Sequence, residues 1–373
     1  MRSFRRAFLA CVLAWGHGSA LGAPPVPRAE LVSEALMLAA ETGDGPASLE
    51  TLIVRPPGPG PFPLAVIAHG GTSAVEGRTN MAPQAYRGVA EEFARRGYAV
   101  VVSMRAGYGR STGRFLEILD RCNPGRSEAA ARTVAVAIRG TIEAARALPY
   151  VDSNRVLVIG QSMGGYGSVA LAADPPPGMI GYINFAGGIR YGGIQCETSW
   201  VADDFGAFGR TARLPSLWVY AANDSHFPPD LAARFHGAHN GAGARAELRA
   251  LPAHGADGHA FIRTGIAHWR PHVDSFLKDH GLPNWDRAPS DLRLLAAPSM
   301  PGALTTATQK EGWTRYLEGS SHRAFAVGPA GRTNFGYASG RADEDAARQA
   351  AIEFCERHAK PCRIVASDEA SSD

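Results

Sequence analysis

The segment Arg155–Ser168, RVLVIGQSMGGYGS, decides the fold of this chain. The apolar run Val156–Ile159 predicts a buried strand, and the small-residue pattern Tyr166–Ala173 predicts a helix. Between them, Gly160-Gln161-Ser162-Met163-Gly164 matches G-x-S-x-G in the strand–turn–helix context that this motif requires. Such a turn strains the backbone of its serine, and the glycines avoid collisions with neighbouring elements. The segment therefore predicts Ser162 as a nucleophile at the positive end of a helix dipole.

A serine hydroxyl needs a general base, and the base needs a group that orients it. Downstream, the predicted strand Ser216–Ala222 is followed by Asp224, and the predicted strand Ala246–Leu251 by a loop that ends at His259. Open α/β sheets place their sites at the carboxyl ends of strands. We predict a triad of Ser162, Asp224 and His259, in which His259 takes the serine proton and Asp224 fixes its tautomer.

Other histidines offer alternatives. His254 lies on the same loop as His259 and is the alternative base, but the glycines before His259 and the helix pattern after it favour His259. His268 and His272 have the i, i+4 spacing of a metal pair on a helix. No carboxylate or cysteine cluster accompanies them in the sequence, so we predict no metal site and no cofactor.

The loop after an earlier strand predicts an oxyanion hole. The apolar run Pro63–Ala68 ends in His69-Gly70-Gly71-Thr72. In sites of this kind one backbone N–H donor belongs to the residue after the nucleophile, here Met163, and the other to this loop. We predict Gly71 as the second donor, with Thr72 as the alternative.

The first residues predict export. Three arginines within the first six residues precede an apolar core, Ala7–Trp15, that is too short to span a bilayer, and Ala20-Leu21-Gly22 ends in a small-residue site. We predict a signal peptide over residues 1–22, with a retained anchor as the alternative, and a periplasmic or secreted mature protein. Cleavage lowers the formal charge of +3 to about zero, so we expect neither nucleic acid nor an anionic membrane as a partner. After cleavage we expect no membrane insertion.

The cysteines are interpreted in the light of export. Of five cysteines, Cys11 leaves with the signal peptide, and an even count in an oxidising compartment favours disulfides. Cys355 and Cys362 flank the end of a helix pattern, which predicts a local bridge. Cys122 and Cys196 then form the second predicted pair, between two loops on the active-site side.

Alternating strand and helix patterns between about Leu31 and Leu282 predict a mostly parallel sheet with helices on both faces. We place this domain at residues 29–283 and a polar linker at 284–311. Predicted helices include Tyr86–Arg96, Ala129–Ala147 and Asp230–Ala238. The predicted strands are Leu49–Val54, Leu64–Ala68, Tyr98–Ser103, Val156–Ile159, Gly181–Phe185, Leu217–Ala222 and Ala246–Leu251.

A separate small α+β unit is predicted over residues 312–368. A hairpin of Arg323–Val327 and Asn334–Ala338, the helix Ala342–His358 and the strand Cys362–Ala366 give a β-β-α-β order. A unit of this size is marginally stable alone, which fits a disulfide between Cys355 and Cys362.

The span from about Pro63 to Pro283 resembles the dienelactone hydrolase-like branch of the serine α/β hydrolases. The resemblance rests on AVIAHGG, SMRAGYGRSTG, VDSNRVLVIGQSMGG, LWVYAANDSHFPP and GADGHAF, in this order. It implies the α/β-hydrolase fold, with Ser162 as nucleophile, Asp224 as acid, His259 as base and His69-Gly70-Gly71 as the oxyanion loop. Dienelactone hydrolases proper use a cysteine nucleophile, so the serine points away from dienelactone and towards a carboxylic ester.

Two weaker resemblances concern other segments. Arg105–Gly113 is similar to the corresponding loop of prolyl-oligopeptidase-type peptidases, which implies an amide or peptide substrate. The C-terminal unit is similar, through AGRTNFGYASG and its two cysteines, to a small domain of exported bacterial proteins, which implies no chemistry.

Three functional hypotheses follow. The first is an exported serine hydrolase that cleaves a small-molecule carboxylic ester through an acyl-enzyme on Ser162. The second is a peptidase or amidase of prolyl-oligopeptidase type; only a small cap over Ile189–Leu214 is available to gate the site, with Trp200, Phe205 and Phe208 as an apolar wall or as packed cap residues. The third is a binding or scaffolding protein with incidental hydrolysis, whose C-terminal unit recruits a cell-envelope partner.

Overall fold

The computed structural model describes residues 31–117, 125–190, 198–288, 292, 300–318, 323–339, 341 and 344–367. The predicted signal peptide and both cysteines of the predicted pair Cys122 and Cys196 lie outside the described residues. No helix in the described ranges is long and apolar enough to cross a membrane.

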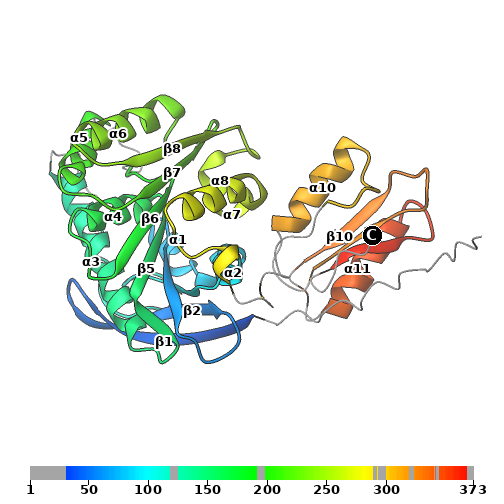
Figure 1. Cartoon of the computed structure of the whole chain (residues 1–373), viewed down its shortest axis with the longest axis horizontal. Helices are drawn as coiled ribbons and strands as arrows, with labels where there is room; N and C mark the ends of the chain where they lie inside the picture. Colours follow the sequence, from blue (N-terminus) through cyan, green and yellow to red (C-terminus); the bar gives the residue numbers. More distant parts are fainter. Residues whose placement is uncertain are drawn as a thin grey trace, which may run out of the picture.

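An eight-stranded sheet forms the larger unit (Figure 1), in the order β1-β2-β4-β3-β5-β6-β7-β8. The first two strands form an antiparallel hairpin, β2 also pairs antiparallel with β4, and all remaining pairs are parallel. The predicted α/β-hydrolase fold with a mostly parallel sheet is confirmed. The strands are β1 (Val32–Thr42), β2 (Gly45–Arg55), β3 (Phe62–Ala68), β4 (Ala99–Ser103), β5 (Val151–Gln161), β6 (Met179–Phe185), β7 (Ser216–Ala221) and β8 (Ala246–Leu251).

Strand β1 was not among the predicted strands. Its sequence, VSEALMLAAET, is rich in Leu, Met, Ala and Glu, which favour helix. The structure instead pairs every residue of β1 with β2, and its side chains alternate between more and less buried positions over Val32–Ala40. Long-range pairing thus overrides the local helix preference of this segment.

Helices cover both faces of the sheet (Figure 1). Alternate residues of β5 point to opposite faces, so Val156 and Val158 belong to one apolar core and Leu157 and Ile159 to the other. On the first face lie α3 (Arg126–Arg146), α4 (Met163–Ala172), α5 (Thr198–Gly209) and α6 (Pro229–Gly241). On the second lie α2 (Arg87–Arg95), α7 (Phe261–Thr264) and α8 (Ile266–Asp279). Shorter helices are α1 (Val75–Thr79), η1 (Pro83–Tyr86), η2 (Gly258–Ala260) and η3 (Trp285–Arg287).

The C-terminal unit is a three-stranded antiparallel sheet of order β10-β9-β11. Its strands are β9 (Ala324–Val327), β10 (Phe335–Ala338) and β11 (Arg363–Ser367), with α11 (Glu344–Glu356) after the hairpin. The β-β-α-β order is as predicted, and a disulfide joins Cys355 to Cys362 with a Cα–Cα distance of 6.1 Å.

Helix α10 (Ala307–Glu318) begins inside the predicted linker and covers the other face of the small sheet. Trp313 and Tyr316 of α10 pack on Phe325 of β9. Ala351 and Cys355 of α11 pack on the opposite face of the small sheet. Helix α10 also contacts α7 and α8 of the larger unit. The exact domain boundaries stay a prediction.

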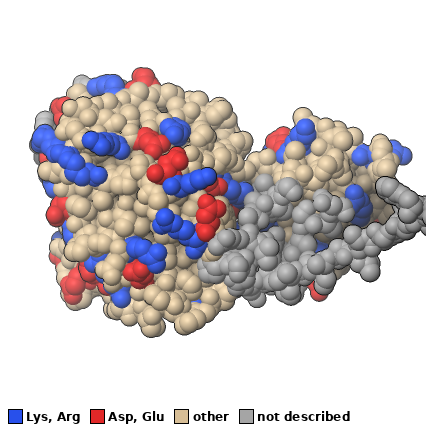
Figure 2. All heavy atoms as spheres, in the orientation of Figure 1, with Lys and Arg blue, Asp and Glu red and all other residues tan. Residues whose placement is uncertain are grey.

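Charged side chains are mixed on the surface. On the face shown in Figure 2, arginine and lysine side chains lie among aspartate and glutamate side chains over the larger unit. Ion pairs on the protein surface include Arg139–Asp174 and Arg249–Glu247.

Candidate active site

The backbone of Ser162 has the strained conformation that its motif predicts. Strand β5 ends at Gln161, helix α4 begins at Met163, and Ser162 between them has φ 53° and ψ −118°. A positive φ costs free energy for a residue with a Cβ atom, so the surroundings must hold it. The N–H of Ser162 donates to the carbonyl of Phe185 at 2.9 Å. Ser162 therefore stands at the carboxyl edge of the parallel strands.

The motif glycines leave no space for a side chain. A Cβ atom at Gly164 would lie 2.1 Å from the carbonyl oxygen of Ala68, and one at Gly160 would lie 2.4 Å from that of Gly164. Both separations are far inside van der Waals contact. The turn can pack against strand β3 only because these positions are glycine.

The structure brings Ser162, His259 and Asp224 into one chain of hydrogen bonds. Ser162 Oγ lies 3.0 Å from His259 Nε2, and His259 Nδ1 lies 3.0 and 3.2 Å from the two carboxylate oxygens of Asp224. A carboxylate only accepts, so Nδ1 carries the ring proton and Nε2 accepts from the serine hydroxyl. This chain can move the serine proton to Nε2 and stabilise the imidazolium that forms.

Asp224 is held in place by its own loop. Its side chain is fully buried, and Oδ1 accepts the backbone N–H groups of His226 at 2.8 Å and Phe227 at 3.0 Å. These two bonds hold the Asp224 carboxylate in the orientation in which it accepts Nδ1–H of His259. The loop after β7 therefore orients the carboxylate of Asp224 through its own backbone N–H groups.

The alternative histidines lie in other contacts. The ring of His254 packs on Phe261 and His268, at centroid distances of 5.3 and 5.0 Å. His268 and His272 belong to no group of three metal-ligating side chains within the described ranges. The described group of that kind is Asp224, His226 and His259.

The predicted oxyanion loop lies against the serine turn. A Cβ atom at Gly70 would be 3.4 Å from Cβ of Ser162, and one at Gly71 would be 3.1 Å from Cβ of Met163. Gly70 N–H already donates to the hydroxyl of Tyr86 at 3.2 Å. The N–H groups of Gly71 and Met163 donate to no other residue in the part of the chain that the structure describes. These two groups can receive a developing oxyanion.

A buried histidine fixes the orientation of this loop. His69 Nε2 accepts the backbone N–H of Arg105 at 3.0 Å, so Nδ1 carries the ring proton and donates to the carbonyl of Gly70 at 2.5 Å. Burial, and then the Arg105 guanidinium, hold the pKa of His69 well below its usual range. The neutral ring is therefore a permanent donor to Gly70.

The Arg105 guanidinium binds two backbone carbonyls of this loop. It donates to the carbonyl of His69 at 2.7 Å and to that of Gly70 at 3.3 Å. A peptide unit is planar and trans, so its C=O and N–H point in opposite directions. Since the Gly70 carbonyl is turned towards Arg105 and His69, the N–H of Gly71 is turned away from them.

A buried ion pair supports Arg105. Its guanidinium donates to both oxygens of Glu117, at 2.5 and 3.0 Å, and Tyr108 donates to the same carboxylate at 2.8 Å. Burial lowers the pKa of Arg105, but the Glu117 carboxylate more than compensates and raises it. Sequence reasoning missed this unit, because only the resemblance over Arg105–Gly113 pointed to the segment.

A second bridge connects the oxyanion loop to the base. The Tyr86 hydroxyl donates to Oε1 of Gln161, whose Nε2 donates to the carbonyl of His259 at 3.0 Å. Gln161 immediately precedes the nucleophile. One side chain thus couples the positions of the oxyanion loop, the serine turn and the histidine loop.

The ring of His226 stacks on that of His259, with centroids 4.0 Å apart and an interplanar angle of 18°. His226 was not among the predicted site residues. Next to it, Ser225 Oγ donates to Asp257 at 2.8 Å, and Asp257 also accepts the N–H of His259 at 2.9 Å. His226 therefore forms part of the immediate surroundings of the base.

Of the two interpretations of the cap aromatics, an apolar wall or packed residues, packing holds for Phe205 and Phe208. Phe205 and Phe208 are fully buried, and Phe205 packs on Tyr166, Trp218 and Phe235. Trp200 lies at the start of α5 and is half-buried.

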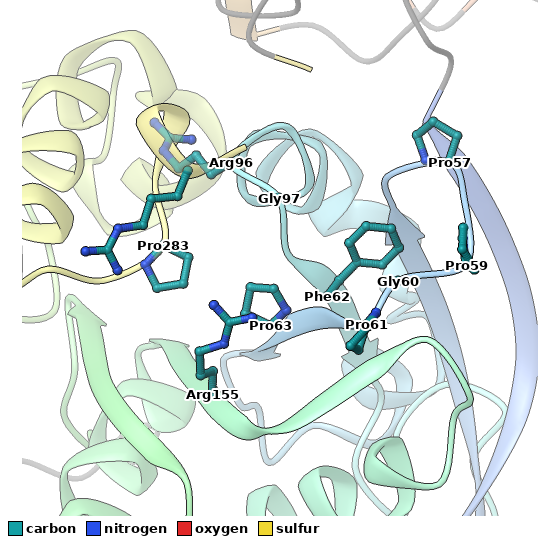
Figure 3. A pocket seen from close by; sticks show the side chains of 11 residues that line it. Pro57, Pro59, Gly60, Pro61, Phe62, Pro63, Arg96, Gly97, Arg155 and Pro283 are labelled. Atoms are coloured by element: carbon teal, nitrogen blue, oxygen red, sulfur yellow. The ribbon is translucent and has the colours of Figure 1, made fainter. Parts of the chain in front are cut away.

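A described pocket of about 380 Å³ lies away from this chemistry (Figure 3). Phe62 and Arg155 line it, at the start of β3 and within the first half of β5. Its other lining residues include Pro57, Pro59, Pro61, Pro63 and Pro283. The site of Ser162 follows the opposite, carboxyl end of β5, so this pocket is not the catalytic one.

The fold and the family comparison define a serine hydrolase of the α/β-hydrolase fold. The model of the X-Pro dipeptidyl-peptidase (S15) family matches residues 44–235, more than half of the chain. The chain belongs to this family. The matched range includes Ser162 and Asp224 and ends before His259.

Several solved structures are similar to the chain. Pyrococcus furiosus esterase Pf2001 has 16% identity and a TM-score of 0.47, covering 66% of this chain and 92% of its own. Xanthomonas campestris XC6422, a serine hydrolase without a lid, has 18% sequence identity and a TM-score of 0.44, and the match covers 67% of this chain and 96% of its own. Pyrococcus horikoshii acylaminoacyl peptidase has 15% sequence identity and a TM-score of 0.47, and the match covers 70% of this chain and 44% of its own. No curated protein matches the sequence.

Proposed function

We propose that this chain is an exported serine hydrolase that cleaves a carboxylic ester through an acyl-enzyme on Ser162. The observation that carries the proposal is the hydrogen-bonded chain Ser162–His259–Asp224. The adjacent N–H groups of Gly71 and Met163, which donate to no other described residue, support it further.

In the acylation step, Ser162 Oγ attacks the ester carbonyl carbon while its proton passes to His259 Nε2. The oxyanion of the tetrahedral intermediate accepts hydrogen bonds from Gly71 and Met163. When the intermediate collapses, the bond to the leaving oxygen breaks. His259 gives its proton to that oxygen, and the alcohol departs.

In the deacylation step, a water molecule gives a proton to His259 Nε2 and attacks the acyl carbon. The bond between that carbon and Ser162 Oγ then breaks, and the serine takes the proton back. The carboxylic acid leaves, and the site returns to its starting state. His259 Nε2 gives or takes the proton in each of these transfers.

A peptide is the second candidate substrate, because the chain belongs to a family whose description is X-Pro dipeptidyl-peptidase. The acyl-enzyme chemistry is the same, but an amine must be protonated by His259 to leave, whereas an alkoxide leaves more readily. We therefore rank a small-molecule ester first.

Export and the role of the C-terminal unit complete the proposal. The arginines and apolar core of residues 1–22 support a periplasmic or secreted location. The C-terminal unit contributes no group to the hydrogen-bonded chain at Ser162, and we propose that it binds a cell-envelope partner.

A fluorophosphonate probe and matched substrates test the proposal. We expect labelling of Ser162 in the wild-type protein and none in Ser162→Ala. Paired ester and amide substrates with the same acyl group, including an X-Pro p-nitroanilide, should show a higher kcat/KM for the ester. Absence of labelling at Ser162 would overturn the mechanism, and a higher kcat/KM for the X-Pro amide would favour the peptidase.

A further inference from the structure

We propose that Tyr86 and Gln161 are positioning residues, which together hold the oxyanion loop and the histidine loop in place around Ser162. Each acts through the backbone groups that it binds, and not on the substrate. The inference rests on the proposed function of Ser162, and the experiment below separates the failure of one from the failure of the other.

Three hydrogen bonds connect the two loops. The N–H of Gly70 donates to the Tyr86 hydroxyl at 3.2 Å, and that hydroxyl donates to Oε1 of Gln161. Nε2 of Gln161 in turn donates to the carbonyl of His259 at 3.0 Å. We call this series the Tyr86–Gln161 bridge. It runs from the loop after β3 to the loop after β8, through the residue that precedes the nucleophile.

The direction of each bond in the bridge is fixed. A backbone N–H only donates and a backbone carbonyl only accepts, so Gly70 uses a lone pair of the Tyr86 oxygen and His259 faces the amide nitrogen of Gln161. The single proton of the Tyr86 hydroxyl is left for Oε1 of Gln161. The opposite orientation of the Gln161 amide would lose the bonds at both of its ends.

Burial keeps the bridge in this one arrangement. The side chains of Tyr86 and Gln161 are both buried, so removing either leaves a buried polar group without its partner. Burial also raises the pKa of the Tyr86 hydroxyl, which therefore stays protonated and remains a donor. Gln161 ends strand β5 and pairs with Phe185 of β6, so the sheet supplies a rigid anchor for the bridge.

At one end, the bridge determines where the base lies. The N–H of His259 donates to Asp257 at 2.9 Å, and its carbonyl accepts from Gln161. The bond from Gln161 thus joins the backbone of His259 to the strand that leads into Ser162. In the proposed reaction, Nε2 of His259 must stay near Ser162 Oγ, at 3.0 Å in the structure, because a displacement of about 1 Å costs about 100-fold in rate.

At the other end, the bridge orients an oxyanion donor. Tyr86 accepts the N–H of Gly70, while Arg105 and His69 hold the Gly70 carbonyl. Gly70 is thus held on both sides, and its carbonyl belongs to the peptide unit that carries the N–H of Gly71. Base and oxyanion donor therefore take their positions from the same pair of side chains.

Steady-state kinetics on a p-nitrophenyl ester test the bridge in the full chain. Gln161→Met has a similar length but neither donates nor accepts as an amide does, and we expect kcat to fall about 10- to 100-fold with little change in KM. Gln84→Met is the matched control and should keep the wild-type kcat, since Gln84 is exposed and lies two residues before Tyr86. A wild-type kcat in folded Gln161→Met would overturn the inference, because a side chain that only stabilises the fold leaves the rate per folded molecule unchanged.

Tyr86→Phe provides a second test that removes a single oxygen atom. We expect kcat to fall about 10-fold with little change in KM, and an unchanged kcat would overturn the inference even if Gln161→Met does not fold. In the double variant, the loss should be at least about 3-fold smaller than the product of the two single losses, because both changes break the same bond. A loss equal to that product would mean that the two residues act separately, which also overturns the bridge.

Fluorophosphonate labelling of the wild-type protein separates the two proposals. If Ser162 is labelled and the variants keep the wild-type kcat, the bridge fails and the hydrolase proposal stands. If Ser162 of the wild type is not labelled and no ester is hydrolysed, the hydrolase proposal fails, and the bridge as a catalytic device fails with it.

Discussion

The guanidinium of Arg105 donates to the carbonyl of Gly70, and this contact orients the peptide unit whose N–H belongs to Gly71. The distance is 3.3 Å, and the same guanidinium holds the carbonyl of His69 at 2.7 Å. The direction of the predicted Gly71 donor thus depends on an arginine that lies outside the predicted triad.

We predict that Arg105→Lys lowers kcat by about 10- to 100-fold with little change in KM. A lysine keeps the charge but cannot hold two carbonyls and Glu117 together, so the Gly71 donor becomes misaligned, and losing one such donor costs about 100-fold or more. Steady-state kinetics on a p-nitrophenyl ester measure the effect, with thermal unfolding as a control for folding. An unchanged kcat in a folded variant would show that the loop holds its direction alone.

We predict that His259→Ala lowers kcat by about four orders of magnitude or more, because the members of a triad act as a unit. His254→Gln is the matched control, since His254 lies on the same loop but packs on Phe261 and His268. Comparison of kcat for both variants decides between the two bases. A larger loss in His254→Gln would assign the base to His254.

We predict that Gly164→Ala destabilises the protein by about 1–3 kcal/mol or more, because its Cβ would be 2.1 Å from Ala68 O and the turn must move. Gly237→Ala is the control, since no atom lies within 4 Å of its added Cβ. Urea unfolding measures both variants. Equal stabilities would contradict the close approach of the turn to β3.

We predict a pH-dependent cost for Glu92→Gln. Burial raises the pKa of Glu92, but Arg270 at 2.7 Å, together with Arg96, lowers it well below its usual range. The stabilisation is therefore present above about pH 4.5, the ordinary pKa, and is lost as the pH falls further. At pH 7 the variant should lose about 3–5 kcal/mol, because guanidinium groups stay buried without their carboxylate.

The test of this prediction is urea unfolding at several pH values. The stability difference between wild type and Glu92→Gln should shrink as the pH falls below about 4.5. Glu311→Gln removes an exposed pair with Arg315 and should cost at most about 1 kcal/mol at every pH. A constant difference for Glu92→Gln would exclude the buried ion pair as its cause.

We predict that replacing Cys355 and Cys362 by serine destabilises the C-terminal unit by about 2–3 kcal/mol, as expected from closing so short a loop. Hydrogen exchange should show faster opening of β9, β10 and α11, while protection in β5 and β6 stays unchanged. Equal loss of protection in both sheets would mean that the two units unfold together.

The sequence was most informative where chemistry and local structure coincide. The motif around Ser162 contains its own strand, turn and helix, and Asp224 and His259 each follow a recognisable strand, so the positions of all three could be predicted. The fold class followed from the same alternation of strands and helices.

The unpredicted features depend on contacts between distant segments. Glu117 supports the loop at His69 only because folding pairs it with Arg105, whose guanidinium also donates to the carbonyl of His69. No motif in either segment predicts this ion pair. Likewise β1 is helix-prone in isolation, and α10 begins at the end of a stretch whose prolines and polar residues resemble a linker. The stacking of His226 on His259 depends on how two loops meet.

The contact of α10 with α7 and α8 makes the appended unit part of the scaffold behind the base. The chain runs from His259 through α7 into α8, and Ala267 of α8 packs against the apolar cluster of α10 and the small sheet. A load applied to the C-terminal unit, as by attachment to a surface, is therefore carried by the helices that follow the histidine loop.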